Sequence, residues 1–288
     1  MSVLQTAISG ALVGGLFALM AVGLSLTWGM LRVINLAHFA VILVSAYLTY
    51  ELATSLRVDP LLTILAIAPL MFVLAAAVQW LFQASRISEF NSLLVSFGLL
   101  IVAIQLVTNF WTADFRQIPA SINPYALQSV GLGPFRFPTP TLIAFLFALA
   151  IVGLGYYALE RTYPGRALRA FAQDPEIAAA YGIDHRRLSM LLSGAAGATG
   201  AVAGMLYAVA NPLTPDRAFE WIGIVFAVVI IGGIGNVVGT LVAGALVLMT
   251  AALVSFWWSP SVAPLVVFSA IVLTLIVRPQ GLFARRGS

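Results

Sequence analysis

Two long segments of this chain carry no charged residue, and they constrain its fold more than any other feature. Residues 1–31 and residues 221–277 contain no Asp, Glu, Lys or Arg. A helix needs about 20 consecutive apolar residues to cross the hydrocarbon core of a bilayer. The first segment therefore predicts one spanning helix, and the second is long enough for three. Because no basic residue precedes the first segment, we expect it to stay in the mature protein and not to be cleaved as a signal peptide.

The composition agrees with an integral membrane protein. Only 8% of the 288 residues are charged and 61% are hydrophobic, whereas charged residues make up about 25% of a soluble domain. So few ions cannot cover the surface of a water-soluble domain. We therefore expect an all-α, polytopic membrane protein in which residues 1–288 form a single transmembrane domain.

Charged residues and prolines divide the chain into predicted spans. A polar loop with five prolines, from Pro119 to Pro140, separates the first four spans from the rest. The segment 221–234 is short for a full crossing. We expect about eight to nine transmembrane helices, at residues 1–31, 33–50, 60–85, 90–113, 141–159, 188–210, 221–234, 236–258 and 261–277.

The basic residues predict how the chain is oriented. Arginine and lysine are enriched in short cytoplasmic loops, and residues 160–187 hold nine of the 24 charged residues (14 basic and 10 acidic). With that segment in the cytoplasm, the N-terminus lies outside and the C-terminus in the cytoplasm. Ten arginines then fall inside and four outside: the inner ones are Arg32, Arg86, Arg161, Arg166, Arg169, Arg186, Arg187, Arg278, Arg285 and Arg286, and the outer ones are Arg57, Arg116, Arg136 and Arg217.

Several functional classes are excluded by residues that the sequence lacks. The chain has no cysteine, which excludes disulfides and thiolate metal sites. It has no lysine, which excludes a Walker A loop and a Schiff-base cofactor. The two histidines, His38 and His185, do not form a metal-binding motif. We therefore expect no enzyme, no metal and no cofactor. We expect no nucleic-acid partner either, since the arginines lie at predicted membrane edges.

The positions of the acidic residues indicate which energy source could drive transport by such a protein. All ten map to a loop or to the edge of a predicted span. Carriers driven by protons or sodium usually place a carboxylate at membrane depth. Two classes therefore remain: a channel, or a transporter driven by a separate ATPase.

The charged segment 160–187 contains the pattern of a short helix. Asp174 is suited to the N-cap, Pro175 to the first helical position and Glu176 to the positive end of the helix dipole, while Gly182 is a natural C-cap. The arginines around this helix, such as Arg169, can bind acidic groups of a partner or anionic lipid headgroups. The pattern alone leaves both interpretations open.

Two sets of residues resemble known transporter sequences. Glu176 to Gly182 resembles the EAA loop of ABC-importer permeases, although it departs at Ile177 and lacks the later Leu-Pro. A wider set of motifs, in family order, resembles the branched-chain amino-acid ABC-transporter permease family over nearly the whole chain. One departure is Phe39, where relatives usually have Gly. The motifs are Gly15–Gly29, Val33–His38, Gly165–Ala170 with Asp174 and Gly182–Ile183, Gly232–Asn236 with Gly239, and Arg278–Phe283.

The resemblance implies a permease subunit of the bacterial inner membrane that moves solute by alternating access. Its implied partners are a second permease subunit, two cytoplasmic ATPases that hydrolyse the ATP, and an external substrate-binding protein. Family substrates include Leu, Ile and Val, and related permeases serve urea, short amides and other amino acids. A stand-alone channel or facilitator for urea or another small neutral solute is the alternative. In the coupling loop 160–187, the residues expected to respond to the ATPases are Arg169, Asp174, Glu176, Ala178, Ala179 and Gly182.

A few polar side chains inside predicted spans are candidates for the solute pathway. Asn35 and His38 lie three residues apart on one helical face, and Gln105 lies four residues before Asn109 in the span that also holds Ser96. Such residues either line a path or form interhelical polar contacts that fix packing. Small residues at intervals of three or four, as at Gly10 and Gly14, predict close helix contacts. Equivalent stripes are Ser193, Gly197, Gly200 and Gly204, and Gly235, Gly239 and Ala243.

Overall fold

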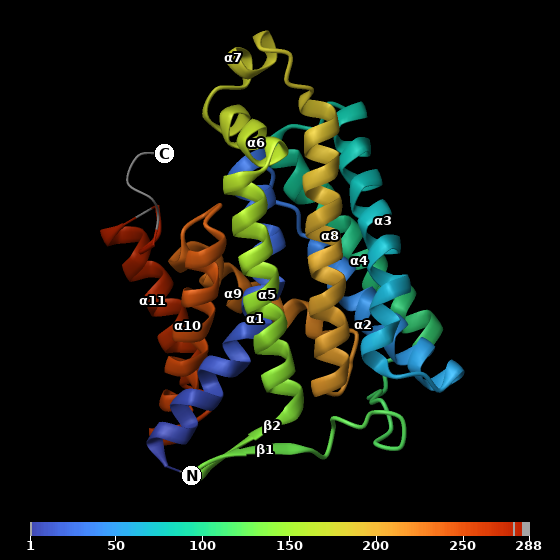
Figure 1. The fold of residues 1–288 in the computed structure, drawn as a ribbon, viewed down its shortest axis with the longest axis vertical. Helices are drawn as coiled ribbons and strands as arrows, with labels where there is room; N and C mark the ends of the chain where they lie inside the picture. Colours follow the sequence, from blue (N-terminus) through green and yellow to red (C-terminus); the bar gives the residue numbers. More distant parts are fainter. Residues whose placement is uncertain (1, 279, 284–288) are drawn as a thin grey trace.

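The computed structural model describes residues 2–278 and 280–283, and in them the chain is built almost entirely of helices (Figure 1). Two of the arginines assigned to the cytoplasmic side, Arg285 and Arg286, lie outside the described residues. The helices are α1 (Val3–Leu31), α2 (Ala37–Leu56), the short 3-10 helix η1 (Pro60–Thr63), α3 (Ile64–Ala84), α4 (Glu89–Trp111), α5 (Thr139–Arg161), α6 (Tyr163–Gln173), α7 (Pro175–Ala180), α8 (His185–Ala210), α9 (Arg217–Gly232), α10 (Val237–Trp257) and α11 (Ala263–Val277).

Each predicted span corresponds to one of these helices, so the all-α polytopic fold is confirmed. Among the described residues, seven helical segments are long and apolar enough to cross a membrane: α1, α2, α3 with η1, α4, α5, α8 and α10. The other two are shorter, with 16 residues in α9 and 15 in α11. The expected shortness of segment 221–234 is therefore observed in α9, and α11 shares it.

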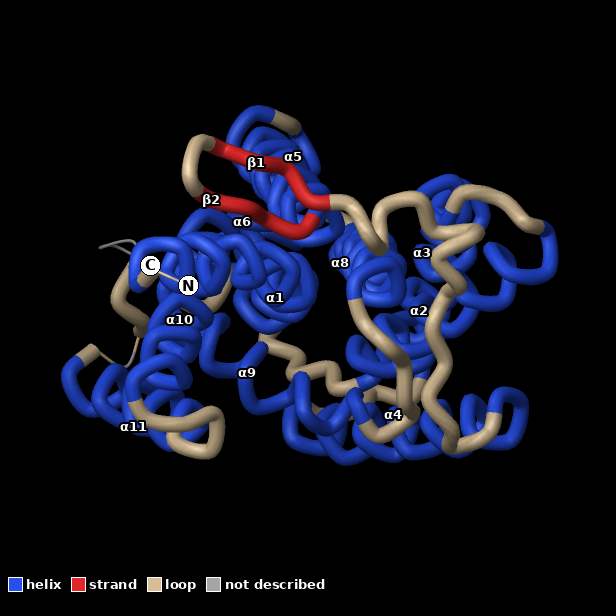
Figure 2. The backbone as a smooth tube through the Cα atoms, turned by 90° about the horizontal axis from the view of Figure 1, so that it is seen from below, coloured by secondary structure: helices blue, strands red, loops and turns tan. Residues whose placement is uncertain are grey.

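Helix α1 lies in the middle of the bundle, where it packs against α5, α8, α9 and α10 (Figure 2). Small residues allow this close approach. A Cβ added to Gly14 would overlap the backbone of Gly244 in α10, and one added to Gly10 would lie 2.7 Å from the Cβ of Ala252. In lipid, where there is little hydrophobic drive between helices, such close backbone packing supplies the association energy. The predicted small-residue contacts of α1 are therefore made within the chain itself.

The α8 stripe is used in the same way on the other side of the bundle. Gly204 lies against the backbone of α2 at Ile42, and Gly197 lies against α3 at Met71 and Ala75. In contrast, α3, α4 and α5 bury the smallest share of their apolar windows. Their outer faces expose large apolar side chains and are suited to contact lipid.

The proline-rich loop contains an element that the sequence did not predict. Residues Ser129–Leu132 (β1) and Phe135–Pro138 (β2) form an antiparallel hairpin. Figure 1 places this hairpin at the opposite end of the bundle from α7. Earlier in the same loop, the amide nitrogen of Asn123 donates a hydrogen bond to the carbonyl oxygen of Val209 at 2.9 Å. The loop is thereby attached to the far end of α8.

Tyr125 attaches the same loop to the start of η1. Its hydroxyl donates a 2.7 Å hydrogen bond to Asp59. This bond holds the proton on the phenol and, with partial burial, raises the pKa of Tyr125 to about 12. The carboxylate of Asp59 also accepts from the backbone N–H of Leu61 and so caps η1.

Candidate solute pathway and coupling surface

A small cavity with a few polar groups in its wall lies inside the bundle, where α1, α2, α3 and α8 meet. Its volume is about 20 Å³, which is enough for a single water molecule. The lining includes the side chains of two predicted pathway residues. The full set is Thr27, Asn35, Ala37, His38, Val41, Ala75, Val78, Ser193, Ala196 and Gly197.

His38 is buried between α1 and α8. Its Nε2 lies 2.9 Å from the carbonyl oxygen of Met20. Because a carbonyl oxygen only accepts, Nε2–H donates in this contact. Gly23 and Gly200 make room for the ring, since a Cβ added at Gly23 would lie 2.6 Å from His38 Cε1. The two glycines therefore position this imidazole at the cavity wall.

Asn35 and Ser96 meet at the start of α2. The Oδ1 atom of Asn35 accepts a hydrogen bond from the N–H of Ala37 at 3.0 Å, and the Oγ of Ser96 accepts one from the N–H of Leu36 at 2.9 Å. These bonds satisfy backbone donors at a helix N-terminus that would otherwise be unpaired. Ser96 thus ties α4 to the end of α2 that borders the cavity.

Gln105 is not brought to this cavity. Its side chain is exposed on α4, where the amide nitrogen donates to Oδ1 of Asn109 at 3.0 Å within the same helix. The predicted pathway residues therefore divide into a group of three around the start of α2 and one residue on an outer face.

Two glutamines of α3 that were not among the predicted pathway residues bond to serines of α8, one of which lines the cavity. Ser193 donates through Oγ to Oε1 of Gln79 at 3.2 Å. One helical turn away, the amide nitrogen of Gln83 donates to Oγ of Ser189. The available sequence signal was the matching spacing of four residues on α3 and on α8, which places each pair on one helical face.

The predicted short helix is present as α7, with Asp174 at its N-cap as expected, Tyr181 at its C-cap and Gly182 directly after it. Oδ1 of Asp174 accepts hydrogen bonds from the N–H groups of Glu176 and Ile177, both at 3.0 Å. Gly182 follows the helix at φ +79° and donates its N–H to the carbonyl of Ala179 at 2.9 Å. A positive φ favours glycine because it has no Cβ. The local sequence therefore determines where this helix begins and ends.

Most of α7 faces away from the rest of the chain. Glu176, Ala179 and Gly182 are exposed, whereas Ala178 is buried. Two large side chains are exposed beside them, with Ile177 58% and Tyr181 84% accessible. An acidic group and two apolar side chains thus form an unpaired surface at one tip of the molecule, which Figure 1 shows above α6.

The preceding helix, α6, links this tip to the bundle and was not predicted as a helix. Arg169 forms a 2.6 Å ion pair with Glu160 at the end of α5. On the other side, the ring of Phe171 stacks on His185, the first residue of α8, with centroids 4.0 Å apart. Arg169, expected to belong to the coupling set, therefore holds α6 against α5.

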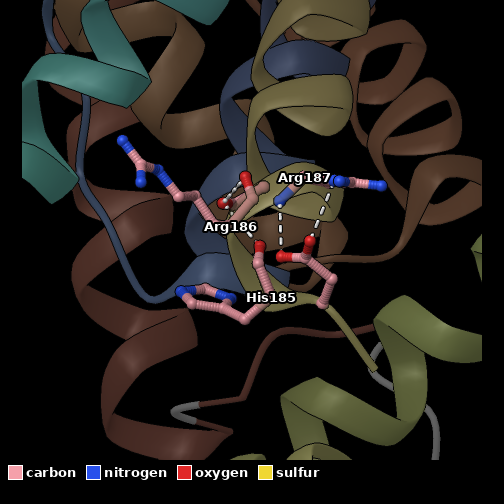
Figure 3. Close-up of polar contacts among 5 residues, drawn as sticks. His185, Arg186 and Arg187 are labelled. Atoms are coloured by element: carbon pink, nitrogen blue, oxygen red, sulfur yellow. Dashed lines mark hydrogen bonds and ion pairs between the residues drawn. The ribbon is translucent and has the colours of Figure 1, made fainter. Parts of the chain in front are cut away.

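The start of α8 is capped by Asp184. Its Oδ1 accepts from the N–H of Arg187 at 3.2 Å, and its Oδ2 lies 3.0 Å from Nε of Arg187. Figure 3 shows the side chains of Arg186 and Arg187 pointing to opposite sides of this helix end. His185 comes directly before them in sequence and its ring contacts Phe171, so this end of α8 is attached to α6.

Comparisons with known proteins agree over nearly the whole chain. The family model described as branched-chain amino acid transport system / permease component matches residues 6–277. The high-affinity branched-chain amino acid transport system permease protein LivH of Escherichia coli is 25% identical over 302 residues, with 98% of this chain and 96% of the relative covered. The corresponding protein BraD of Pseudomonas aeruginosa is 27% identical over 299 residues, with the same coverage.

A third relative is similar to the same extent. The probable branched-chain amino acid transport permease protein LivH of Methanocaldococcus jannaschii is 26% identical over 287 residues, with 96% of this chain and 91% of the relative covered. No solved structure matches this chain.

Proposed function

Because the chain belongs to the family of branched-chain amino acid transport system permease components, we propose that it is the membrane-spanning permease subunit of an ATP-driven importer for branched-chain or related amino acids. The protein is a multi-pass membrane protein, and we place it in the cell (inner) membrane. It moves solute by alternating access, and partner subunits hydrolyse the ATP. It has no cofactor of its own.

The proposed complex contains a second permease subunit, two cytoplasmic ABC ATPases and an external substrate-binding protein. The relatives' names describe a transport system with a permease component, which supports the presence of further subunits. In the orientation that the arginines favour, the α7 end faces the cytoplasm and the hairpin end faces outward.

The exposed α7 carries the proposal for coupling. It is a capped helix whose acidic and apolar side chains have no partner surface within the described chain, and it leads directly into α8, which borders the cavity. An ATPase that binds Glu176, Ile177 and Tyr181 would move the start of α8 together with α7. The direct connection from α7 to α8 is the single observation on which this coupling role depends.

The path is proposed to pass the cavity at Asn35 and His38. Their amide and imidazole groups offer hydrogen bonds to a polar solute, and the small cavity volume is suited to a closed state. Weak binding in the membrane is consistent with transport, because solute must leave the path as well as enter it. Affinity would then reside in the external binding protein.

The test is uptake in proteoliposomes that contain the chain, its permease partner, its ATPases and the binding protein. We expect ATP-dependent uptake of radiolabelled leucine, isoleucine or valine. We expect Glu176→Arg and Gly182→Trp to reduce both uptake and recovery of the ATPases on purification. Gly133→Trp is the matched control, because Gly133 also has a positive φ and open surroundings but lies in the hairpin turn.

Two outcomes would contradict the proposal. Normal uptake and ATPase recovery in both α7 variants would refute the coupling role. Flux of urea or another small neutral solute through the chain alone, without ATP, would favour a stand-alone facilitator.

A further inference from the structure

Two hydrogen-bonded pairs join α3 and α8 in the half of the bundle nearest α7. One is Gln79–Ser193 and the other is Gln83–Ser189, one turn closer to the α7 end. We call these four residues the Gln–Ser ladder. Gln79, Ser189 and Ser193 are buried. Because the two helices run in opposite directions, residues four apart on each come into register and form successive rungs.

The rest of the α3–α8 contact has a different chemistry. Gly197 packs against Met71 and Ala75, and Gly194 packs against the ring of Phe72. Small and apolar residues are enough to hold two membrane helices together. The ladder is therefore a local polar feature at the α7 end of the contact between α3 and α8, which is otherwise apolar.

One oxygen of the ladder is left without a partner. The Oε1 atom of Gln83 is buried and accepts no hydrogen bond from the described residues. Leaving a buried acceptor unpaired is unfavourable, so this rung is weaker than one in which both atoms of the amide are paired.

The ladder lies between the cavity and the α7 end of the bundle. Ser193 contributes to both, because it lines the cavity and bonds to Gln79. Beyond Gln83 and Ser189 the seam ends, since α3 finishes at Ala84 and α8 starts at His185. Separating α3 from α8 at these two rungs would therefore open the cavity toward that end of the molecule.

The first turn of α8 receives any movement of α7. The two helices are separated only by residues 181–184, and Ser189 lies in the next turn after His185. The stack of His185 on Phe171 adds a second link, from α6 to this turn. A displacement of α7 is thus transmitted to the rung at Gln83 first and to the rung at Gln79 next.

We propose that the Gln–Ser ladder is the inner gate of the solute path. Its two hydrogen bonds hold the cavity closed, and the pull of the coupling helix on α8 breaks them so that solute leaves between α3 and α8. The polar rungs then line the exit, where their freed amide and hydroxyl groups offer hydrogen bonds to the passing solute. The direction of release rests on the proposed function, whereas the seal over the cavity does not.

The first experiment tests the seal without relying on transport. Because the chain has no cysteine, Val41→Cys provides one thiol on the α2 wall of the cavity. In inside-out membrane vesicles, the rate of its modification by a cationic, membrane-impermeant methanethiosulfonate is measured. We expect Gln79→Leu/Gln83→Leu in this background to raise the rate about tenfold, because losing two hydrogen bonds shifts the opening equilibrium by that order.

Two further variants keep this experiment decisive. Ser193→Ala removes one rung with a minimal change of volume and should raise the rate several-fold even if the double leucine variant does not fold. Gln105→Leu is the control, because Gln105 is exposed on α4 and bonds only within its own helix; we expect no change. An unchanged rate in Ser193→Ala would overturn the proposal.

The second experiment places the gate in the transport cycle. In the assembled complex, the pair Gln79→Cys/Ser193→Cys is bridged with a short bifunctional thiol reagent. We expect bridging to abolish amino-acid uptake and a reducing agent to restore it. If the unbridged complex transports and bridging has no effect, the gate is wrong. If neither the wild-type complex nor the unbridged variant transports amino acids, the proposed function is wrong. The rate of thiol modification in the first experiment then still decides whether the ladder seals the cavity.

Discussion

The imidazole of His185 stacks on the phenyl ring of Phe171, with 4.0 Å between ring centroids and 10° between ring planes. One residue begins α8 and the other lies in α6, so the contact joins the two helices that flank α7. The covalent path between them runs through α7. A displacement of α7 would therefore reach the start of α8 in two ways. One is the covalent connection through residues 181–184, and the other is the contact between Phe171 and His185.

Replacing the aromatic partner tests this link. We expect Phe171→Ala to lower ATP-dependent uptake several-fold while the complex keeps its ATPases. The surface of α7 remains intact in this variant, but a movement of α7 displaces α8 less because the aromatic contact is lost. The stack itself is worth about 0.5–1.5 kcal/mol, so the melting temperature should fall only slightly. Phe90→Ala is the control, since Phe90 is 70% exposed at the start of α4. Equal uptake in the two variants would show that the stack transmits nothing.

The N-cap of α7 gives a second prediction. Asp174→Ala removes the acceptor of two backbone N–H groups, which costs about 0.5–2 kcal/mol of helix stability. A helix of six residues has little else to hold it, so we expect recovery of the ATPases on purification to fall several-fold. Asp174→Ser keeps a capping oxygen and should restore it. Failure of the serine variant to do so would mean that the charge of Asp174 is needed rather than its cap.

Packing in the centre of the bundle is tested by two glycines. Gly14→Ala places a methyl group against the backbone of Gly244, and such overpacking costs about 1–3 kcal/mol. Gly98→Ala meets nothing within 4 Å, and an alanine in a helix is favoured over glycine by roughly 0.5–1 kcal/mol. Thermal unfolding in detergent should therefore show a lower melting temperature for the first variant and an equal or higher one for the second. A stable Gly14→Ala protein would contradict the observed contact between α1 and α10.

Alkaline titration tests the contact between Tyr125 and Asp59. The pKa of Tyr125 is raised to about 12 by its hydrogen bond to Asp59, above the ordinary value near 10. A raised pKa in the folded state means that the stabilisation is fully present below about pH 10 and is lost as pH rises through about 12. Tyr125→Phe should therefore be less stable than the wild type at pH 8. The difference should shrink between about pH 10 and 12, as followed by thermal unfolding.

Absorbance gives an independent measurement of the same group. The difference between the phenolate titration curves of the wild type and of Tyr125→Phe should contain one group with a midpoint near pH 12. A midpoint near 10 would show that the hydrogen bond does not form in solution.

The sequence by itself determined the spans and the local caps. Charge-free segments such as residues 1–31 require membrane helices, because a bilayer core leaves no partner for backbone groups other than the helix itself. Asp174 and Gly182 marked the ends of α7 correctly, since capping depends on atoms within a few residues. The family resemblance was equally visible in the sequence and is confirmed.

Only the tertiary structure decided which face of each helix turns inward. In a membrane helix both the lipid-facing and the protein-facing sides are apolar, so hydrophobic periodicity gives no rotation. Ser96 and Gln105 occupy the same predicted span, yet the first turns inward to cap α2 and the second lies exposed. For the same reason the Gln–Ser ladder became visible only when α3 and α8 were placed side by side, because its bonds join residues that are over 100 positions apart in the chain.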